Sequence, residues 1–350
     1  MIRFPVIPRY WLVVLAGLLL ATACKQEQPV FNIRFLAFGS QVDLSLVGVD
    51  RDTAQRAAKA IENDFAYLDQ EWHNGGSDLL ARVNRLIPTG KPFAVPPSIL
   101  PLIGLAQEFA TRSGDLFDPA IGKLMDLWGF HANPVECHPP PSTKAIAALV
   151  QARPRMQDLE LNGILLRSRN PQVRLDFDAL IQGYGIDLAI ARLRELGVFN
   201  AVVKTGGNLR AIGDRDGQPW RIPIHRPAGG GVLAIVEVAG DESVFTAGGD
   251  ERNFIYAGKR YHDILDPRTG YPALGAQAVT VLHDNGVTAD AAAHALFIAG
   301  PEGWIPVAKD MGIRYVLLVD DAGTLHMTPA MARRLKILDK APNIRLSEPL

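Results

Sequence analysis

The sequence predicts an α+β fold in which mixed, mainly antiparallel sheets are packed with helices. Three observations support this class. Polar and apolar residues alternate over 41–47, as in a half-buried strand. The later strands and helices follow one another without the regular rhythm of a parallel sheet. Near the C-terminus, two short apolar runs are joined by the turn Asp320-Asp321-Ala322-Gly323, which is typical of antiparallel strands.

The first half of the chain is predicted to be mainly helical after the strand at 41–47. Apolar residues spaced three and four apart predict a helix that begins near Thr53. A glycine-rich loop follows, and shorter helices are expected at 78–84, 99–109 and 142–150.

The second half is predicted to contain most of the strands, as apolar runs bounded by turn residues. A helix at 179–196 follows the first of these strands, with Asp178 at its start. The predicted strands are 173–177, 201–204, 233–238, 278–282, 315–319 and 324–327.

Length and charge restrict the domain organisation and the classes of partner. We expect one large domain over 25–340, built from two packed halves with a linker at 133–142, and a tail at 341–350. The formal net charge of the 350 residues is −1, and no dense Lys/Arg run occurs in the body of the chain. Nucleic acid is therefore not an expected partner.

Residues 1–24 have the features of an export signal. The apolar run 11–23 is too short for an ordinary membrane span, and small residues lead directly to Cys24. This pattern resembles the bacterial lipoprotein processing site, although Ala21 stands where leucine is commoner. We expect lipidation at Cys24 and a lipid-anchored protein in the bacterial cell envelope, facing the periplasm or the extracytoplasmic side. Ordinary signal cleavage is the alternative.

Cys137 is the only other cysteine, so no disulfide can form within the chain once Cys24 is set aside. It lies between Glu136 and His138, and these three side chains together could suggest a metal or thiol site. The prolines that follow favour a solvated loop instead.

The segment 261–272 contains the most informative turn of the chain. Pro267 restricts the backbone and Gly270 permits a positive φ, so Asp266, Arg268 and Thr269 are expected to be held together. An arginine, a hydroxyl and exposed amides favour phosphate binding. A solvated hairpin turn is the alternative for this segment taken alone.

Six motifs, this turn included, occur in an order that resembles the ApbE family, the FAD:protein FMN transferases, over nearly the whole mature chain. Each motif is weak alone, and the series is specific. The motifs are Phe38-Gly39-Ser40, Phe117-Asp118-Pro119, the segment 176–187, Gly206-Gly207-Asn208, the turn at 261–272 and the segment 289–296.

The resemblance implies an ApbE-like, T-fold-like architecture and a metal-dependent transfer reaction. FAD would be the substrate, Mg²⁺ or Mn²⁺ the metal, and FMN would pass to a threonine or serine hydroxyl with release of AMP. The implied acceptor is a flavoprotein subunit of a membrane redox complex. Pyrophosphate chemistry of this kind depends on charge neutralisation and positioning.

The resemblance also implies roles for individual residues. The carboxylate of Asp290 and the carbonyl of Ala179 match metal ligands of the family. For Asp290 the alternative is an acid favoured by the dipole of a helix start, and for Asn84 it is a helix C-cap. The residues expected to contact nucleotide are Ser40, Asn84, Gly206, Gly207, Glu251, Arg268 and Thr269.

Three departures from the family pattern fall where catalysis is expected. The family usually has lysine at Gln182, histidine at Asp263 and threonine at His294. His294 lies four residues after Asp290, so on a helix it could act in metal or proton handling from the same face. His262 is a second candidate base, although on a strand it would face the side opposite to Asp263. The departures leave two alternatives open: a lipoprotein that binds FAD without transfer, and a metal-dependent FAD pyrophosphatase.

Overall fold

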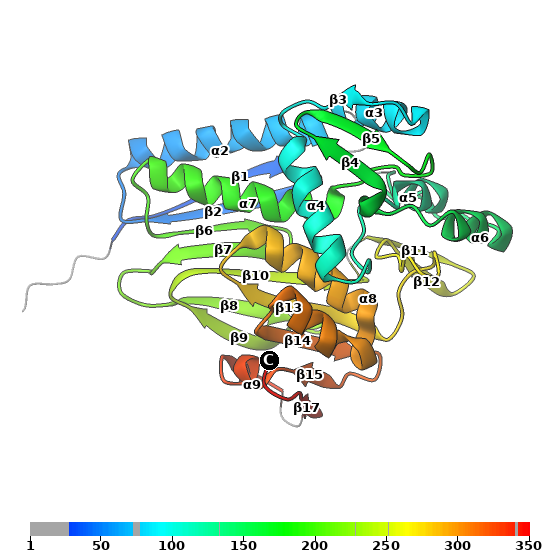
Figure 1. Cartoon of the computed structure of the whole chain (residues 1–350). Helices are drawn as coiled ribbons and strands as arrows, with labels where there is room; N and C mark the ends of the chain where they lie inside the picture. The colour runs from blue at the N-terminus through cyan, green and yellow to red at the C-terminus, as the bar shows by residue number, and fades with distance from the viewer. Residues whose placement is uncertain (1–27, 73–77, 133, 228, 251, 340–341) are drawn as a thin grey trace, which may run out of the picture.

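The computed structural model describes residues 28–72, 78–132, 134–227, 229–250, 252–339 and 342–350 (Figure 1). The predicted export signal, Cys24 and Glu251 lie outside these residues. Within the described ranges, no helix has both the length and the apolar character that crossing a membrane requires.

A nine-stranded sheet forms the centre of the molecule, in the order β1-β2-β6-β7-β10-β13-β14-β15-β17. Its neighbouring strands pair antiparallel, except that β15 and β17 are parallel. The predicted α+β class with mainly antiparallel pairing is therefore confirmed. The strands are β1 (Val30–Ala37), β2 (Ser40–Val47), β6 (Ala201–Thr205), β7 (Asn208–Gly213), β10 (Gly240–Gly248), β13 (Ala276–His283), β14 (Tyr315–Asp320), β15 (Leu325–Met327) and β17 (Ile344–Leu346).

Three smaller sheets surround the large one, in the orders β16-β9-β8, β3-β5-β4 and β11-β12. Their strands are β3 (Phe93–Ala94), β4 (Leu159–Asn162), β5 (Leu165–Ser168), β8 (Trp220–His225), β9 (Val232–Val238), β11 (Asn253–Tyr256), β12 (Lys259–His262) and β16 (Leu335–Ile337).

Helices pack mainly against one face of the large sheet. In Figure 1, α2 and α7 run along β1, β2 and β6, and α8 runs along β10 and β13. The helices are α2 (Arg51–Trp72), α3 (Asp78–Leu86), α4 (Leu100–Arg112), α5 (Gly122–Trp128), α6 (Thr143–Ala152), α7 (Asp178–Glu195), α8 (Gly286–Met311) and α9 (Pro329–Ala332), with short 3₁₀ turns at Ile87–Thr89 and Met156–Asp158.

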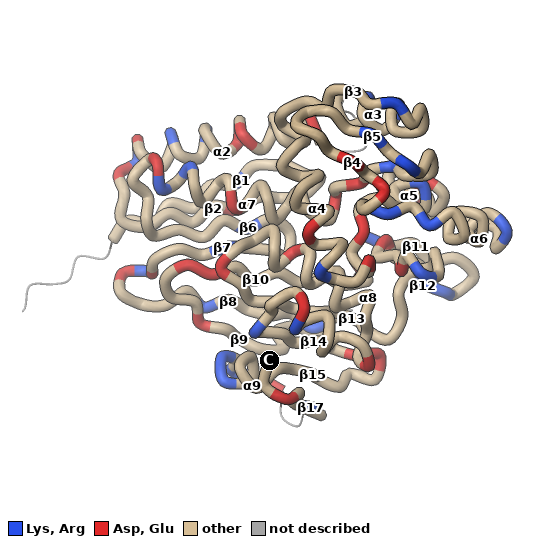
Figure 2. The backbone as a smooth tube through the Cα atoms, viewed as in Figure 1, with Lys and Arg blue, Asp and Glu red and all other residues tan. Residues whose placement is uncertain are grey.

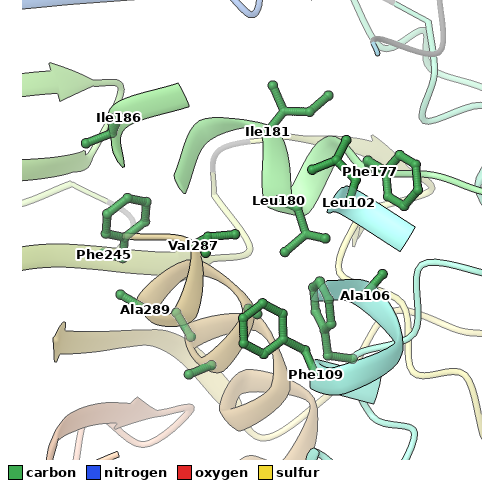
Figure 3. Close-up of a cluster of buried hydrophobic side chains, with 14 of the residues drawn as sticks. Leu102, Ala106, Phe109, Phe177, Leu180, Ile181, Ile186, Phe245, Val287 and Ala289 are labelled. Carbon is green, nitrogen blue, oxygen red and sulfur yellow. The ribbon is translucent and has the colours of Figure 1, made fainter. Parts of the chain in front are cut away.

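Successive side chains of a strand point in opposite directions, and in the middle of the large sheet they enter a separate core on each face. Phe245 of β10 belongs to the core beneath the helices. Its neighbour Val244 belongs to a second core, which the sheet β16-β9-β8 completes. The main core also joins three helices: Leu180 of α7 lies near Phe109 of α4 and Val287 of α8 (Figure 3). This packing holds α7 and α8 side by side.

The predicted strand at 173–177 is wrong. Val173, Leu175 and Phe177 are fully buried, yet the segment forms only an isolated bridge between Arg174 and Ile121. The main chain of Leu175 is satisfied by a side chain, since Asn84 Nδ2 donates to its carbonyl at 2.9 Å and its N–H donates to Asn84 Oδ1 at 2.7 Å. Apolar burial was correctly inferred, but the hydrogen bonds go to a side chain and a loop rather than to a ladder.

Several strands were not predicted. One of them is β1, which forms an edge of the large sheet. It pairs with β2 over its whole length, from Val30 opposite Val47 to Ala37 opposite Ser40. The turn between them places Phe38 and Gly39 at positive φ values of 53° and 66°. This turn brings the Phe38-Gly39-Ser40 motif to the lining of a cavity.

Candidate active site

A cavity of about 520 Å³ lies where the β1–β2 turn, the start of α7, β10 and the first turns of α8 meet. Its lining combines motifs that are far apart in the sequence. Among the lining residues are Ser40, Asp118, Asp176, Asp178, Ala179, Gln182, Asn208, Thr246, Arg252, Asp263, Asp290 and His294. Most of the predicted motifs therefore converge on one hollow.

The close approach of α7 and α8 builds one wall of this cavity. A Cβ atom at Gly183 would lie 2.7 Å from both the Gly286 carbonyl oxygen and Val287 Cα, so glycine is needed for this contact. Asp187 caps α8 by accepting hydrogen bonds from the N–H groups of Gly286 at 2.8 Å and Val287 at 3.0 Å. The start of α8 is thus held against α7 by both packing and charge.

Asp290 is held at this junction by the main chain of α7. Its side chain is only 4% exposed, and its Oδ2 accepts the Gly183 N–H at 3.0 Å. In an α-helix, the Gly183 N–H is the donor for the Ala179 carbonyl, four residues earlier. Because Asp290 takes a share of that donor, the Ala179 carbonyl retains capacity to bind another group. Asp290 lies in the second turn of α8, beyond the first turn where the dipole alternative placed it.

His294 lies one turn after Asp290, and its tautomer follows from its hydrogen bond. Nδ1 is 2.9 Å from the Asp290 main-chain oxygen. A carbonyl only accepts, so Nδ1 carries the proton and Nε2 carries the lone pair of the neutral ring. Burial lowers the pKa of His294, against a smaller opposing effect of the Asp290 carbonyl. The ring is therefore neutral at pH 7 and offers Nε2 as a base or ligand.

These donors fit a hard divalent cation in part. Mg²⁺ prefers oxygen ligands, and the Asp290 carboxylate and the Ala179 carbonyl supply two of them. No cluster of three or more His, Cys, Asp or Glu side chains with metal-binding geometry occurs among the described residues. Such a site would be completed by water and by substrate oxygens, as is usual for Mg²⁺.

The start of α7 carries a buried acid cluster next to this wall. His131 lies between two carboxylates, with Nδ1 2.7 Å from Asp126 Oδ1 and Nε2 2.7 Å from Asp176 Oδ2. Burial alone would lower the pKa of His131, but these two partners raise it to about 10. Asp176 also accepts the Asp178 N–H at 2.9 Å, which caps α7. The His131 imidazolium thus fixes the Asp176 carboxylate, which accepts the N–H of the first residue of α7.

Acidic groups dominate the charge of the cavity. Figure 2 shows acidic positions running through the middle of the molecule between α4 and α5. Burial, followed by the nearby Asp176 charge, raises the pKa of Asp178 to about 7, and burial raises the pKa of Asp118 to about 7. Arg252 is the one Lys or Arg side chain among the described lining residues, and it lies 3.6 Å from Asp178. An added cation would therefore favour the binding of an anionic substrate.

The His131 cluster leads to a prediction about stability and pH. The folded pKa of His131 is about 10, above the ordinary value near 6.5 in the unfolded chain. Its stabilising contribution is therefore complete below about pH 6.5 and is lost as the pH rises through about 10. We expect wild-type protein to lose on the order of a few kcal/mol more than His131→Gln between pH 7 and pH 10. Urea unfolding at several pH values checks this, and parallel profiles would contradict it.

The predicted turn forms as expected. Gly270 has a φ of 74°, and its N–H donates to the Asp266 main-chain oxygen at 2.8 Å. Arg268 is bound to Asp266, with Nε 2.9 Å from Oδ1 and Nη2 2.8 Å from Oδ2. Trp128 Nε1 also donates to the Gly270 carbonyl at 2.8 Å, which anchors the turn to α5.

This turn faces a second cavity of about 760 Å³ next to the first. Arg268, Thr269 and His262 line the second cavity, whereas Asp263 lines the first. His262 and Asp263 thus face different cavities, consistent with the predicted strand geometry. His262 Nε2 donates to the Ala273 carbonyl at 3.1 Å, and burial lowers the pKa of His262. Phosphate contacts from Arg268 and Thr269 stay a prediction.

The other residues predicted to contact nucleotide differ in whether they line the first cavity. Ser40 lines the first cavity. Asn84 is 6% exposed and bonds to the Leu175 main chain, so it is neither a helix C-cap nor a lining residue. Gly206, at a φ of 56°, and Gly207 form the turn before β7, outside the lining set. The contacts of Ser40, Asn84, Gly206, Gly207 and Glu251 with nucleotide all stay predictions.

Several lining residues were not predicted as site residues. Asp118, Asp176 and Asp178 belong to motifs that carried the family resemblance, so their positions were marked although their roles were not. Thr246 lies within β10, and no sequence signal distinguishes it from other strand residues. Asn208 follows the Gly206-Gly207 pair and turns out to bond with Gln182.

Fold and cavity together define an α+β protein with a buried carboxylate at a helix junction, suited to a cation and an oxygen-rich ligand. The family model described as the ApbE family matches residues 38–317. The chain belongs to the ApbE family.

Relatives and solved structures agree with this assignment. The chain is 36% identical to an FAD:protein FMN transferase of Rhodobacter capsulatus over 95% of its length, and it spans 64% of that relative. It is 29% identical to an FAD:protein FMN transferase of Vibrio cholerae, covering 89% of this chain and 94% of the relative.

The fold matches solved members of the family. The ApbE protein of Thermotoga maritima superposes with a TM-score of 0.79 at 27% identity, covering 87% of this chain and 99% of that one. The apo flavinyl transferase ApbE of Pseudomonas stutzeri superposes with a TM-score of 0.75 at 29% identity, covering 88% and 97%.

Proposed function

We propose that this protein is a metal-dependent FAD:protein FMN transferase, which moves FMN from FAD to a threonine or serine hydroxyl of an acceptor protein and releases AMP. Its family and the names of its relatives support this reaction class. The observation that carries the proposal is the placement of Asp290, buried at the cavity and held by the Gly183 N–H beside Ala179.

The reaction replaces the phosphoanhydride bond of FAD by a phosphoester bond to the acceptor hydroxyl. The acceptor hydroxyl oxygen attacks the phosphorus on the FMN side of the pyrophosphate, and the bond to the AMP oxygen breaks, with its electron pair leaving on AMP. The hydroxyl proton passes to a base, a role that we assign to Nε2 of His294, with Asp263 as the second candidate, since both residues line the first cavity. A bound Mg²⁺ or Mn²⁺, held by Asp290 and Ala179, would neutralise the pyrophosphate charge. His262 faces the neighbouring cavity and is not assigned this role.

The role of His294 can be tested by substitution. We expect His294→Ala to lower the transfer rate by about 100-fold at saturating metal, the effect typical of losing a general base. His294→Thr introduces the residue usual in the family and serves as the comparison. A variant that needs more Mg²⁺ but reaches the wild-type rate would make His294 a metal ligand instead. Unchanged rate and unchanged metal requirement would exclude both roles.

The whole proposal is tested with purified full-length protein in detergent, supplied with FAD, Mg²⁺ or Mn²⁺ and a threonine-bearing flavoprotein acceptor domain. Transfer predicts equal amounts of AMP and of covalently fluorescent acceptor on a denaturing gel. AMP with free FMN and no labelled acceptor would indicate an FAD pyrophosphatase. Bound FAD without AMP would indicate a binding protein that does not transfer FMN.

We also propose that the protein is anchored by lipid at Cys24 in the cell envelope, where it would meet flavoprotein subunits of membrane redox complexes. The small residues before Cys24 support this placement. Cys24→Ala is expected to move the protein from the membrane fraction to the soluble fraction of cells. Retention of this variant in the membrane would argue against the lipid anchor.

A further inference from the structure

A chain of hydrogen bonds fixes the orientation of two side-chain amides in the cavity wall. The main-chain N–H of Thr246 donates to Asn208 at 2.8 Å. An N–H can only donate, so the Asn208 atom that faces it is the oxygen, Oδ1. Asn208 is 5% exposed and has no freedom to reverse without losing this bond.

The orientation of Asn208 determines that of Gln182. Since Oδ1 of Asn208 faces Thr246, its Nδ2 faces Gln182, and it lies 3.0 Å from Gln182 Oε1. The oxygen of Gln182 is therefore occupied as an acceptor. Its NH₂ group is the remaining polar end, and Gln182 lines the cavity. Its two N–H donors have no hydrogen-bond partner among the described residues and are available to a ligand.

The position of these donors selects the kind of group they would meet. Gln182 is one residue before Gly183, whose N–H binds Asp290, and three residues after Ala179. Most of the charged residues of the lining are aspartates, and its Arg252 already lies 3.6 Å from Asp178. Neutral N–H donors next to a candidate cation site are suited to an anionic oxygen of a ligand.

We propose that Gln182 donates a hydrogen bond to a pyrophosphate oxygen of the bound dinucleotide, and that Asn208 is the positioning residue that turns its NH₂ group toward that oxygen. The inference rests on the proposed function for the identity of the ligand. It assigns a neutral donor to the position at which the family usually carries a lysine charge. The amide keeps the hydrogen bond but adds no cation.

The test compares substitutions that change the polar group facing the cavity. Gln182→Leu removes the donors, and Gln182→Glu keeps an acceptor for Asn208 while placing a second carboxylate oxygen in the cavity. We expect FAD, measured by flavin fluorescence in Mg²⁺, to bind about 10-fold more weakly to the first variant and about 100-fold more weakly to the second. ADP, used as a competitor of FAD, should weaken in parallel, and adenosine should not. Gln157→Leu, at a partly buried glutamine outside the cavity, is the matched control.

The positioning role of Asn208 is tested by a double-mutant cycle. Asn208→Asp can still accept the Thr246 N–H but cannot donate, so Gln182 should reverse and present its oxygen to the ligand. The added charge of the aspartate acts in both backgrounds, so we expect a loss of FAD affinity that is about 10-fold larger in the wild-type background than in the Gln182→Leu background. A structural or purely electrostatic effect of Asn208→Asp would be equal in both backgrounds. Melting temperatures show which variants fold, and Gln182→Glu carries the test if Asn208→Asp does not.

The outcomes separate this inference from the proposed function. Wild-type affinity for FAD in both Gln182 variants would overturn the role of Gln182, even if transfer by the wild type is intact. An equal loss from Asn208→Asp in both backgrounds would overturn the positioning role. FAD binding without AMP release would defeat the transferase proposal, while the affinities still decide the role of Gln182. Absence of FAD binding by wild-type protein would overturn both.

Discussion

Asp290→Asn is expected to abolish flavin transfer, with a loss of at least about 100-fold in rate. The amide oxygen of asparagine can still accept the Gly183 N–H, which now donates to Asp290 at 3.0 Å, so the α7–α8 junction should persist. The negative charge that would hold a cation is lost. AMP release should therefore fall at every Mg²⁺ concentration, while the melting temperature changes little.

Asp284→Asn is the matched control for this substitution. Asp284 precedes α8 and its side chain is 82% exposed, so its replacement should leave the rate unchanged. Isothermal titration of Mg²⁺ provides a second measurement, and the heat of binding should disappear only in the Asp290 variant. Near wild-type transfer by Asp290→Asn would remove the observation on which the proposed function rests.

Periodicity predicted the elements whose burial follows a repeating pattern. In α2, Ile61, Phe65 and Leu68 are spaced three and four apart and are all buried. In β2, Val42, Leu44 and Leu46 alternate with partly exposed residues and are fully buried. The buried face of each element depends on the spacing of residues within that element, so it can be predicted from a single sequence.

The segment 173–177 shows where such reasoning fails. Its apolar residues are as buried as those of a strand, but the partner that satisfies Leu175 is Asn84, 91 residues earlier in the chain. Local sequence reports burial and not the source of the hydrogen bonds. The same limit applies to Asn84 itself, whose hydrogen bonds to the Leu175 main chain no local pattern indicates.

The parts of the cavity that lie within one element were predictable, and those that join different elements were not. Asp290 and His294 share a helix face, so their proximity follows from spacing alone. Gln182 and Asn208 meet only because β7 lies beside α7 in the folded chain. The family resemblance marked most of the segments that converge here, but the hydrogen-bond order from Thr246 to Gln182 is a property of the tertiary structure.

Gly183→Ala is expected to have the second large effect, on stability and on the site together. The added Cβ would lie 2.7 Å from the Gly286 carbonyl oxygen and from Val287 Cα, which are backbone atoms that cannot rotate away. Overpacking of this kind costs roughly 3 kcal/mol. Chemical unfolding should show a loss of this size, and FAD affinity should fall as the Gly183 N–H moves from Asp290.

Gly104→Ala separates this steric effect from the general effect of replacing glycine in a helix. Gly104 lies in α4, and a Cβ there would meet nothing within 4 Å. Alanine should therefore stabilise the protein by about 0.5–1 kcal/mol through its higher helix propensity. Opposite signs for the two variants would show that the α7–α8 contact needs glycine at Gly183. Equal effects would mean that α8 can move away from α7 at little cost, and that the position of Asp290 does not depend on this contact.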